Sequence, residues 1–165
     1  MTDPTPFNSL ELRRALGAFA TGITVISILD AAGKPQGITV NSFNSVSLEP
    51  PLILWSLALS NPNFEAFQTA KRFAVNILAE DQMAISNRFA SLLDDKFVGI
   101  ETRGGLENVP LLDGCAAILE CLTETLYPGG DHLIILGRVE RLHRHSRPPL
   151  IYHNGNYAAV GRSLS

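Results

Sequence analysis

Residues 116–127 read Ala-Ala-Ile-Leu-Glu-Cys-Leu-Thr-Glu-Thr-Leu-Tyr, and residues 133–143 read Leu-Ile-Ile-Leu-Gly-Arg-Val-Glu-Arg-Leu-His. These two segments decide the fold. Pro128-Gly129-Gly130-Asp131 lies between them and has the composition of a tight turn. Because both segments are long and rich in apolar and β-branched residues, they predict two antiparallel strands joined as a hairpin.

Apolar side chains lie on both faces of the first of these strands. One face carries Cys115, Ala117, Leu119 and Cys121, and the other carries Ala116, Ile118, Leu122 and Leu126. A strand with one face in water would not show this pattern. We therefore expect the outer face to be covered, and a second subunit is one candidate for the cover.

Helices and shorter strands flank this hairpin. Ser9 is the expected N-cap of a first helix, and Asp81 is the expected N-cap of a helix that runs to about Ser91. Strands are expected at residues 23–29, 37–40, 52–59, 73–78 and 151–153, another helix is expected to open at 60–63, and 92–110 are expected to form a long connection with little regular structure. This order does not alternate as a parallel β-α-β sheet would. The predicted fold is mainly β with peripheral helices, arranged as an antiparallel barrel.

Length and composition limit the possible functions. The 165 residues predict a flexible N-terminal arm at 1–8 and a single domain at 9–165. With 45% apolar residues and a net charge of −3, the chain is globular, and neither nucleic acid nor an anionic membrane is an expected partner. No apolar run approaches the length of a membrane helix, and the N-terminus lacks the pattern of a secretory signal. We expect a cytoplasmic protein in which Cys115 and Cys121 are buried, reduced thiols and no metal is bound.

Most familiar catalytic motifs are absent, including phosphate-binding loops and nucleophile elbows. The unusual stretch is 39–47, in which Thr39, Asn41, Ser45 and Ser47 would share one face of a regular strand. Small hydroxyl and amide groups leave the backbone approachable, so this face could line a site for a flat ligand with polar edges or a phosphate. A solvated strand face is the alternative.

Four further features could serve a ligand. Ser60-Asn61-Pro62-Asn63-Phe64 predicts a helix start suited to a phosphate, although most such starts bind nothing. Arg88-Phe89 ends a helix, where an arginine is also favoured by the helix dipole. Asp131-His132 and the segment 152–157 lie at predicted turns, where turn chemistry and aromatic packing are the ordinary explanations.

Taken together, five ordered blocks resemble one family. They are residues 12–22, residues 37–51 beginning Gly37-Ile38-Thr39-Val40-Asn41-Ser42-Phe43, residues 73–78, Gly130-Asp131-His132 with 137–139, and residues 149–153. The chain is similar over nearly its whole length to the short-chain flavin reductases with the FMN-binding split-barrel fold. These are the reductase components of two-component flavin-dependent monooxygenases.

The resemblance implies a site. Around the flavin and its phosphate it places Thr39, Val40, Asn41, Ser42, Ser45, Val46, Ser47, Ser60, Asn61, Phe64, Arg88 and Phe89. Toward the nicotinamide it places Gly130, Asp131 and His132, with His153 and Tyr157 at the edge of the site. His132 is the implied catalytic residue, and its role would be to orient the nicotinamide.

The function implied by the resemblance is an NAD(P)H-dependent flavin reductase. It would transfer a hydride from NADH or NADPH to FMN, with FAD as a possible alternative, and the flavin would carry the chemistry. A homodimer and a partner monooxygenase that receives the reduced flavin are also implied. Two alternatives remain: a flavin-binding protein without reductase activity, and a related split-barrel oxidase acting on a phosphorylated vitamin.

Overall fold

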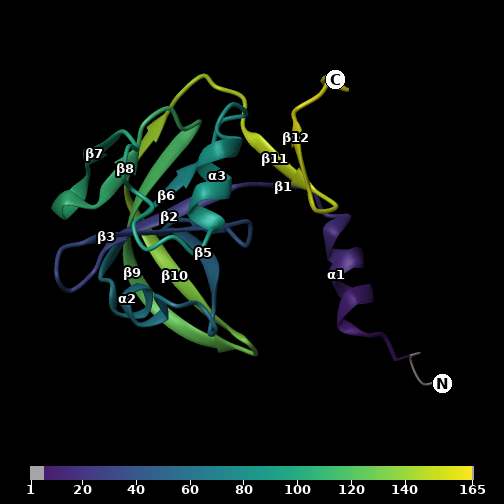
Figure 1. Ribbon diagram of the computed structural model, residues 1–165, viewed down its shortest axis with the longest axis horizontal. Coiled ribbons are helices and arrows are strands. Elements are labelled where there is room, and N and C mark those ends of the chain that lie inside the picture. Colours follow the sequence, from purple (N-terminus) through teal and green to yellow (C-terminus); the bar gives the residue numbers. More distant parts are fainter. Residues whose placement is uncertain (1–5, 165) are drawn as a thin grey trace.

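The computed structural model describes residues 6–164, of which Figure 1 shows the arrangement. Its elements in chain order are α1 (Ser9–Gly17), β1 (Thr21–Gly22), β2 (Thr24–Leu29), β3 (Pro35–Val40), β4 (Asn44–Leu48), β5 (Pro51–Ala58), α2 (Phe64–Thr69), β6 (Arg72–Ile77), α3 (Met83–Ala90), β7 (Thr102–Gly104), a 3-10 turn (Leu106–Asn108), β8 (Pro110–Leu112), β9 (Ala117–Gly129), β10 (His132–Arg144), β11 (Leu150–His153) and β12 (Asn156–Ala159). With 47% strand and 16% helix, the mainly β prediction is confirmed. Each described helix is too short or too polar to span a membrane.

Seven strands form the main sheet, in the order β3-β2-β6-β9-β10-β5-β4, and all its pairings are antiparallel. The predicted long hairpin is β9–β10, which lies at the centre of this sheet. The ladder does not close into a barrel, because β3 and β4 are its two edges. The two edges are linked by side chains across a split: Ser42, after β3, contacts Ser56 of β5, and Gln36 of β3 contacts Asn63 in the loop that follows β5.

One core cluster fills the inside of the curled sheet. Trp55 is its largest side chain, and the rings of Phe67 and Phe73 meet it edge to face, with ring centroids 5.9 and 6.0 Å away. A Cβ on Gly137 would lie 2.4 Å from the Phe73 ring, so only glycine fits at this point of β10. Alternation along β5 follows from this packing, since Ile53, Trp55 and Leu57 are buried and the residues between them face outward.

The second core cluster covers the outside of β9. Ile118 packs there with Phe89 of α3 and with Val109, Leu111 and Leu112 around β8. The chain's own segments therefore cover the first half of this strand, and the expectation that a second subunit covers it is wrong there. The apolar residues on both faces of β9 indicated that both faces are covered. They could not indicate which segment of the chain covers the outer face.

Element boundaries differ from expectation at two helix starts. Asn8, not Ser9, caps α1, because Asn8 and Glu11 exchange the two hydrogen bonds of a capping box. Asp81 does not cap α3. A turn closed by the Gln82 N–H on the Ala79 carbonyl delays that helix to Met83, and Asp81 pairs with Arg147.

The connection at 92–110 contains short regular elements, namely β7 and the 3-10 turn that leads to β8. The predicted terminal strand becomes a hairpin of β11 and β12, which pairs with β1. In Figure 1 this hairpin extends from the sheet toward α1, and α1 stands apart from the sheet. Of the arm predicted at 1–8, residues 1–5 lie outside the described residues.

Both cysteines, Cys115 and Cys121, are buried and free. Burial raises the pKa of each thiol to about 12, so both stay protonated at neutral pH.

Candidate functional site

Three neighbouring cavities follow β3 and the residues after it. The first has about 780 Å³ and lies between residues 36–39 of β3, residues 61–63 before α2, and residues 89–94 with Lys96. A smaller cavity of about 200 Å³ shares Thr39 and Ala90 with it. The third has about 830 Å³ and shares Asn41 and Tyr152 with the small one. We call the three together the β3 groove, and the first of them the front cavity.

Thr39 and Asn41 are the predicted site residues that the structure brings to the centre of this groove. The Thr39 hydroxyl donates to the Ser86 carbonyl at 2.7 Å, which fastens β3 to α3. Val40 lines the small cavity beside them, and its carbonyl accepts from the Thr24 hydroxyl at 3.1 Å. Asn41 is exposed and lines both the small and the third cavity. Its amide is therefore available to a ligand.

The predicted ladder of small polar residues on a single strand face is wrong. β3 ends at Val40 and β4 begins at Asn44, so two strands replace one. The register then shifts within β4, where Ser45 pairs with Ile53 and Ser47 pairs with Leu52. Because Ile53 and Leu52 are neighbours with opposite faces, Ser45 and Ser47 point to opposite faces as well. Ser45, Val46 and Ser47 lie outside the β3 groove, and a flavin contact by them stays a prediction.

Ser42 lies at the turn between the two strands and lines the third cavity. Its hydroxyl donates to the Ser56 carbonyl at 3.2 Å and accepts from the Ser56 N–H at 2.9 Å. The predicted site residue Ser42 thus joins the chain after β3 to β5.

The loop before α2 forms the wall of the front cavity opposite α3. Asn61 lines it, and its side-chain oxygen accepts from the Asn63 N–H at 2.8 Å. The Asn63 amide donates in turn to Gln36 of β3 at 3.2 Å, across the split. Ser60 is exposed next to this wall, while Phe64 packs against the inner core. Sequence reasoning missed Gln36, since only the fold brings β3 to this loop.

A flavin contact by Arg88 and Phe89 stays a prediction, and of the two Phe89 lines the front cavity. The Arg88 guanidinium donates to the carbonyls of Lys96 and Val98, each at 2.6 Å. Phe89 is fully buried and meets the Phe97 ring edge to face, with ring centroids 4.9 Å apart. Both residues therefore hold the chain that follows α3, and this chain forms a wall of the front cavity.

Lys96 was not predicted as a site residue, and it is a cation in that wall of the front cavity. Its Nζ donates to the Phe89 carbonyl at 2.9 Å and lies 3.3 Å from the Gly37 carbonyl of β3. Burial lowers its pKa below the ordinary lysine value. No local pattern marks this residue, because it lies in a polar stretch and Gly37 is 59 residues away.

Tyr157 of β12 lines the small cavity, and its predicted place at the edge of a nicotinamide site stays a prediction. Its hydroxyl lies 2.9 Å from Ser86 Oγ and donates to Asn87 Oδ1 at 2.8 Å. Its ring packs on Tyr152 with centroids 5.7 Å apart. His153 is exposed and lies outside the groove, with Nε2 3.2 Å from the Asn154 amide nitrogen.

The turn between β9 and β10 carries the predicted nicotinamide residues. Gly130 has φ of +69°, which requires glycine, and the Asp131 carbonyl accepts from the Leu59 N–H at 3.0 Å. His132 pairs with Ala58 on β5. Since Ala58 and Ser56 both face outward, His132 shares the outer face of the sheet with the Ser42–Ser56 pair. It lies outside the three cavities of the groove.

Asp131 and His132 also contact each other, with Oδ1 2.7 Å from Nδ1. This contact with His132 holds the pKa of the exposed Asp131 carboxyl below its usual value. A carboxylate that accepts from Nδ1 would leave Nε2 free to face a ligand.

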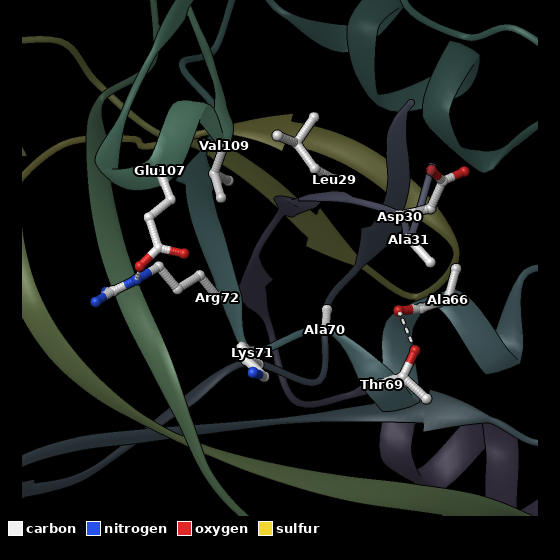
Figure 2. Close-up of a pocket in the computed structure, with 10 residues that line it drawn as sticks. All are labelled: Leu29, Asp30, Ala31, Ala66, Thr69, Ala70, Lys71, Arg72, Glu107 and Val109. Atoms are coloured by element: carbon white, nitrogen blue, oxygen red, sulfur yellow. Dashed lines mark hydrogen bonds and ion pairs between the residues drawn. The ribbon is translucent and has the colours of Figure 1, made fainter. Parts of the chain in front are cut away.

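A separate cavity of about 340 Å³ lies beside α2 (Figure 2). None of the predicted site residues lines it. Arg72 points toward Glu107 in this view, with Nε 2.6 Å from Oε1, and it also pairs with Glu140. The Thr69 hydroxyl donates within its own helix. Arg72, Glu107 and Thr69 are thus each paired within the protein.

The β3 groove fits a flavin nucleotide in its donors and size. Amide side chains and backbone groups line it, with aromatic rings at one end, and its two larger cavities fall within the roughly 300–1,000 Å³ of ordinary ligand sites.

Residues 16–161 match the family model described as the flavin reductase like domain, and the chain belongs to this family. The chain is 41% identical over 94% of its length to an NADH-dependent FMN reductase of Agrobacterium fabrum, of which it covers 88%. It is also 41% identical, over 93% of its length, to the reductase component of the flavin-dependent trigonelline monooxygenase of Acinetobacter baylyi.

A solved structure agrees with the fold. An NADH:FAD oxidoreductase of Streptomyces globisporus, solved with NAD and FAD fragments, superposes with a TM-score of 0.90 at 34% identity and 96% coverage of both chains. The chain spans about half the length, 49%, of the Acinetobacter relative and of another curated relative that is 46% identical to it.

Proposed function

We propose that this protein is an NAD(P)H-dependent flavin reductase that binds FMN in the β3 groove and reduces it by hydride transfer. The observation that carries the proposal is the groove itself, in which Thr39 and Asn41, residues 61–63 and Tyr157 come together from distant parts of the chain. The reductase names of relatives that align over more than nine-tenths of this chain support the same activity.

The residues of the groove would hold and orient the flavin. When bound, the flavin supplies a ring that accepts a hydride, and the protein supplies position and electrostatics. Asn41 would hydrogen-bond the polar edge of the ring, and residues 61–63 would face the phosphate side. His132 would orient the nicotinamide from the outer face of the sheet, with Asp131 holding its ring in place.

The test is anaerobic mixing of the purified protein with NADH and FMN. We expect NADH-dependent loss of the yellow flavin absorbance at a rate far above that of the free reagents. Binding of FMN without bleaching would indicate the flavin-binding protein instead. Bleaching that needs a phosphorylated vitamin and no NADH would indicate the split-barrel oxidase. The same assay with FAD and with NADPH decides the cofactor and co-substrate preferences.

A homodimer is part of this proposal. Outward-facing Leu52, Leu54, Ile134 and Leu136 form an apolar patch on β5 and β10. Apolar patches of this kind mark interaction sites. We expect sedimentation to report twice the mass of the chain, and a monomer at micromolar concentration would contradict this.

A partner and a location complete the proposal. Relatives named as monooxygenase reductase components support transfer of the reduced flavin to an oxygenase. The two buried thiols, Cys115 and Cys121, support a cytoplasmic location. The organisation of residues 9–165 as a single domain stays a prediction.

A further inference from the structure

The chain that follows α3 is fastened to the rest of the molecule by two cations. We define the 91–98 segment as this stretch, which forms the outer wall of the front cavity with residues 91–94 and Lys96. Leu92, Leu93 and Val98 are exposed, so apolar burial does little to hold it. Phe97 is the residue of the segment that packs into a core cluster. Its position therefore depends largely on polar contacts.

Those contacts form a short chain from β3 to the far end of the segment. Lys96 Nζ bridges the Gly37 carbonyl of β3 and the Phe89 carbonyl at the end of α3. Arg88 of α3 donates to the carbonyls of Lys96 and Val98. Hydrogen bonds from charged donors are stronger than neutral ones, and these four converge within a few residues.

Gly37 makes this approach possible. A Cβ at this position would lie 2.5 Å from the Phe89 ring and 3.3 Å from the Phe97 ring. With glycine there, the ring pair seats directly against β3, and Lys96 reaches the β3 backbone beside the front cavity.

We propose that Lys96 and Arg88 are positioning residues that latch the 91–98 segment over the front cavity and thereby set how fast the flavin nucleotide leaves. This rests on the proposed function, because the front cavity is taken to hold the flavin. Neither cation needs to touch the reacting atoms. In a reductase that hands its product to another enzyme, the latch would govern release without governing hydride transfer.

The first test needs no flavin. Amide hydrogen exchange across residues 91–98 is measured in the wild-type protein and in Lys96→Met, which keeps the length of the side chain but removes its donors. We expect amide exchange across residues 91–98 to be at least about tenfold faster in Lys96→Met than in the wild-type protein. The melting of the β9–β10 hairpin should not change. Lys96→Arg, which retains donors for both carbonyls, should restore most of the protection. Unchanged exchange in Lys96→Met would overturn the latch.

The second test measures FMN release by the recovery of FMN fluorescence on dilution. Lys96→Met and Arg88→Met should release FMN about tenfold faster or more than the wild-type protein. Lys71→Met, which removes a charge beside the other cavity, is the matched control and should behave as wild type. Faster exchange without faster FMN release, or an equal effect of Lys71→Met, would contradict the proposal.

The two hypotheses fail in different ways. A wild-type protein that binds FMN behind the latch but does not oxidise NADH would contradict the reductase function and leave the latch intact. A protein that reduces FMN with NADH, but whose exchange across residues 91–98 does not change in Lys96→Met, would contradict the latch and leave the reductase function intact. A wild-type protein that does not bind FMN would overturn both.

Discussion

Ser42 and Ser56 exchange two hydrogen bonds, one from the Ser56 N–H to Ser42 Oγ at 2.9 Å and one from the Ser42 hydroxyl to the Ser56 carbonyl at 3.2 Å. The turn after β3 is thereby tied to β5, although the two strands are not paired in the sheet. The pair bridges the split in the curled sheet and borders the β3 groove. It links the stability of the fold to the shape of the site.

Ser42→Ala tests this link. The substitution leaves the partly buried Ser56 N–H without its acceptor, so we expect a loss of about 1–2 kcal/mol in the free energy of unfolding. Urea denaturation measures it. Ser45→Ala is the control, because Ser45 is an exposed serine for which the structure gives no side-chain partner in residues 6–164. Equal stability of the two variants would show that the serine pair contributes nothing.

Asn41→Leu tests the centre of the groove. A bulky apolar side chain at this exposed position removes an amide from the flavin site, and loss of one or two hydrogen bonds should weaken FMN binding about 5- to 150-fold. Ser47→Leu tests the predicted flavin contact of β4 in the same way. FMN titration by fluorescence quenching compares them. Unchanged affinity in Asn41→Leu would place the flavin elsewhere.

His132→Ala separates nicotinamide binding from turn structure. The turn itself is held by Gly130 and by the Asp131 carbonyl, and neither needs an imidazole. We expect kcat/KM for NADH to fall about 5- to 150-fold, mainly through KM, with FMN affinity and melting temperature nearly unchanged. Stopped-flow reduction measures this, with the exposed His145→Ala as control. Wild-type NADH dependence in His132→Ala would remove this residue from the mechanism.

The lowered pKa of the Glu120 carboxyl predicts how the stability of the fold depends on pH. Burial alone would raise its pKa, but the hydrogen bonds from Arg141, the Leu106 N–H and His143 lower it to about 2. Because the folded pKa lies below the unfolded value of 4.5, this carboxylate stabilises the fold above pH 4.5. Its contribution, about 3 kcal/mol at most, is lost as the pH falls from 4.5 toward 2.

Glu120→Gln should therefore be less stable than wild type at pH 7 and should show a flatter loss of stability between pH 4.5 and 2. Denaturation at pH 7, 4.5 and 3 measures this. Glu65→Gln on the exposed side of α2 is the matched control. Parallel curves for wild type and Glu120→Gln would contradict the role assigned to this network.

Local pattern determined most elements of this protein. Strand alternation and turn residues act over a few positions, so the hairpins β2–β3, β9–β10 and β11–β12 follow from the residues that form them. Gly130 illustrates this, since its positive φ is demanded by the turn itself. The resemblance of ordered blocks then identified the family, and Thr39, Asn41 and Asn61, for which it implies flavin contacts, line the β3 groove.

Tertiary structure decided what fills, covers and fastens these elements. Periodicity assigns a residue to a face, but a face is covered by whichever distant segment packs there, as residues 109–112 cover β9. The bulge in β4 moved Ser45 and Ser47 to opposite faces, because an edge strand tolerates an extra residue at little cost. Arg88 and Lys96 bind backbone carbonyls, which carry no sequence signal and are brought within reach only by the folded chain.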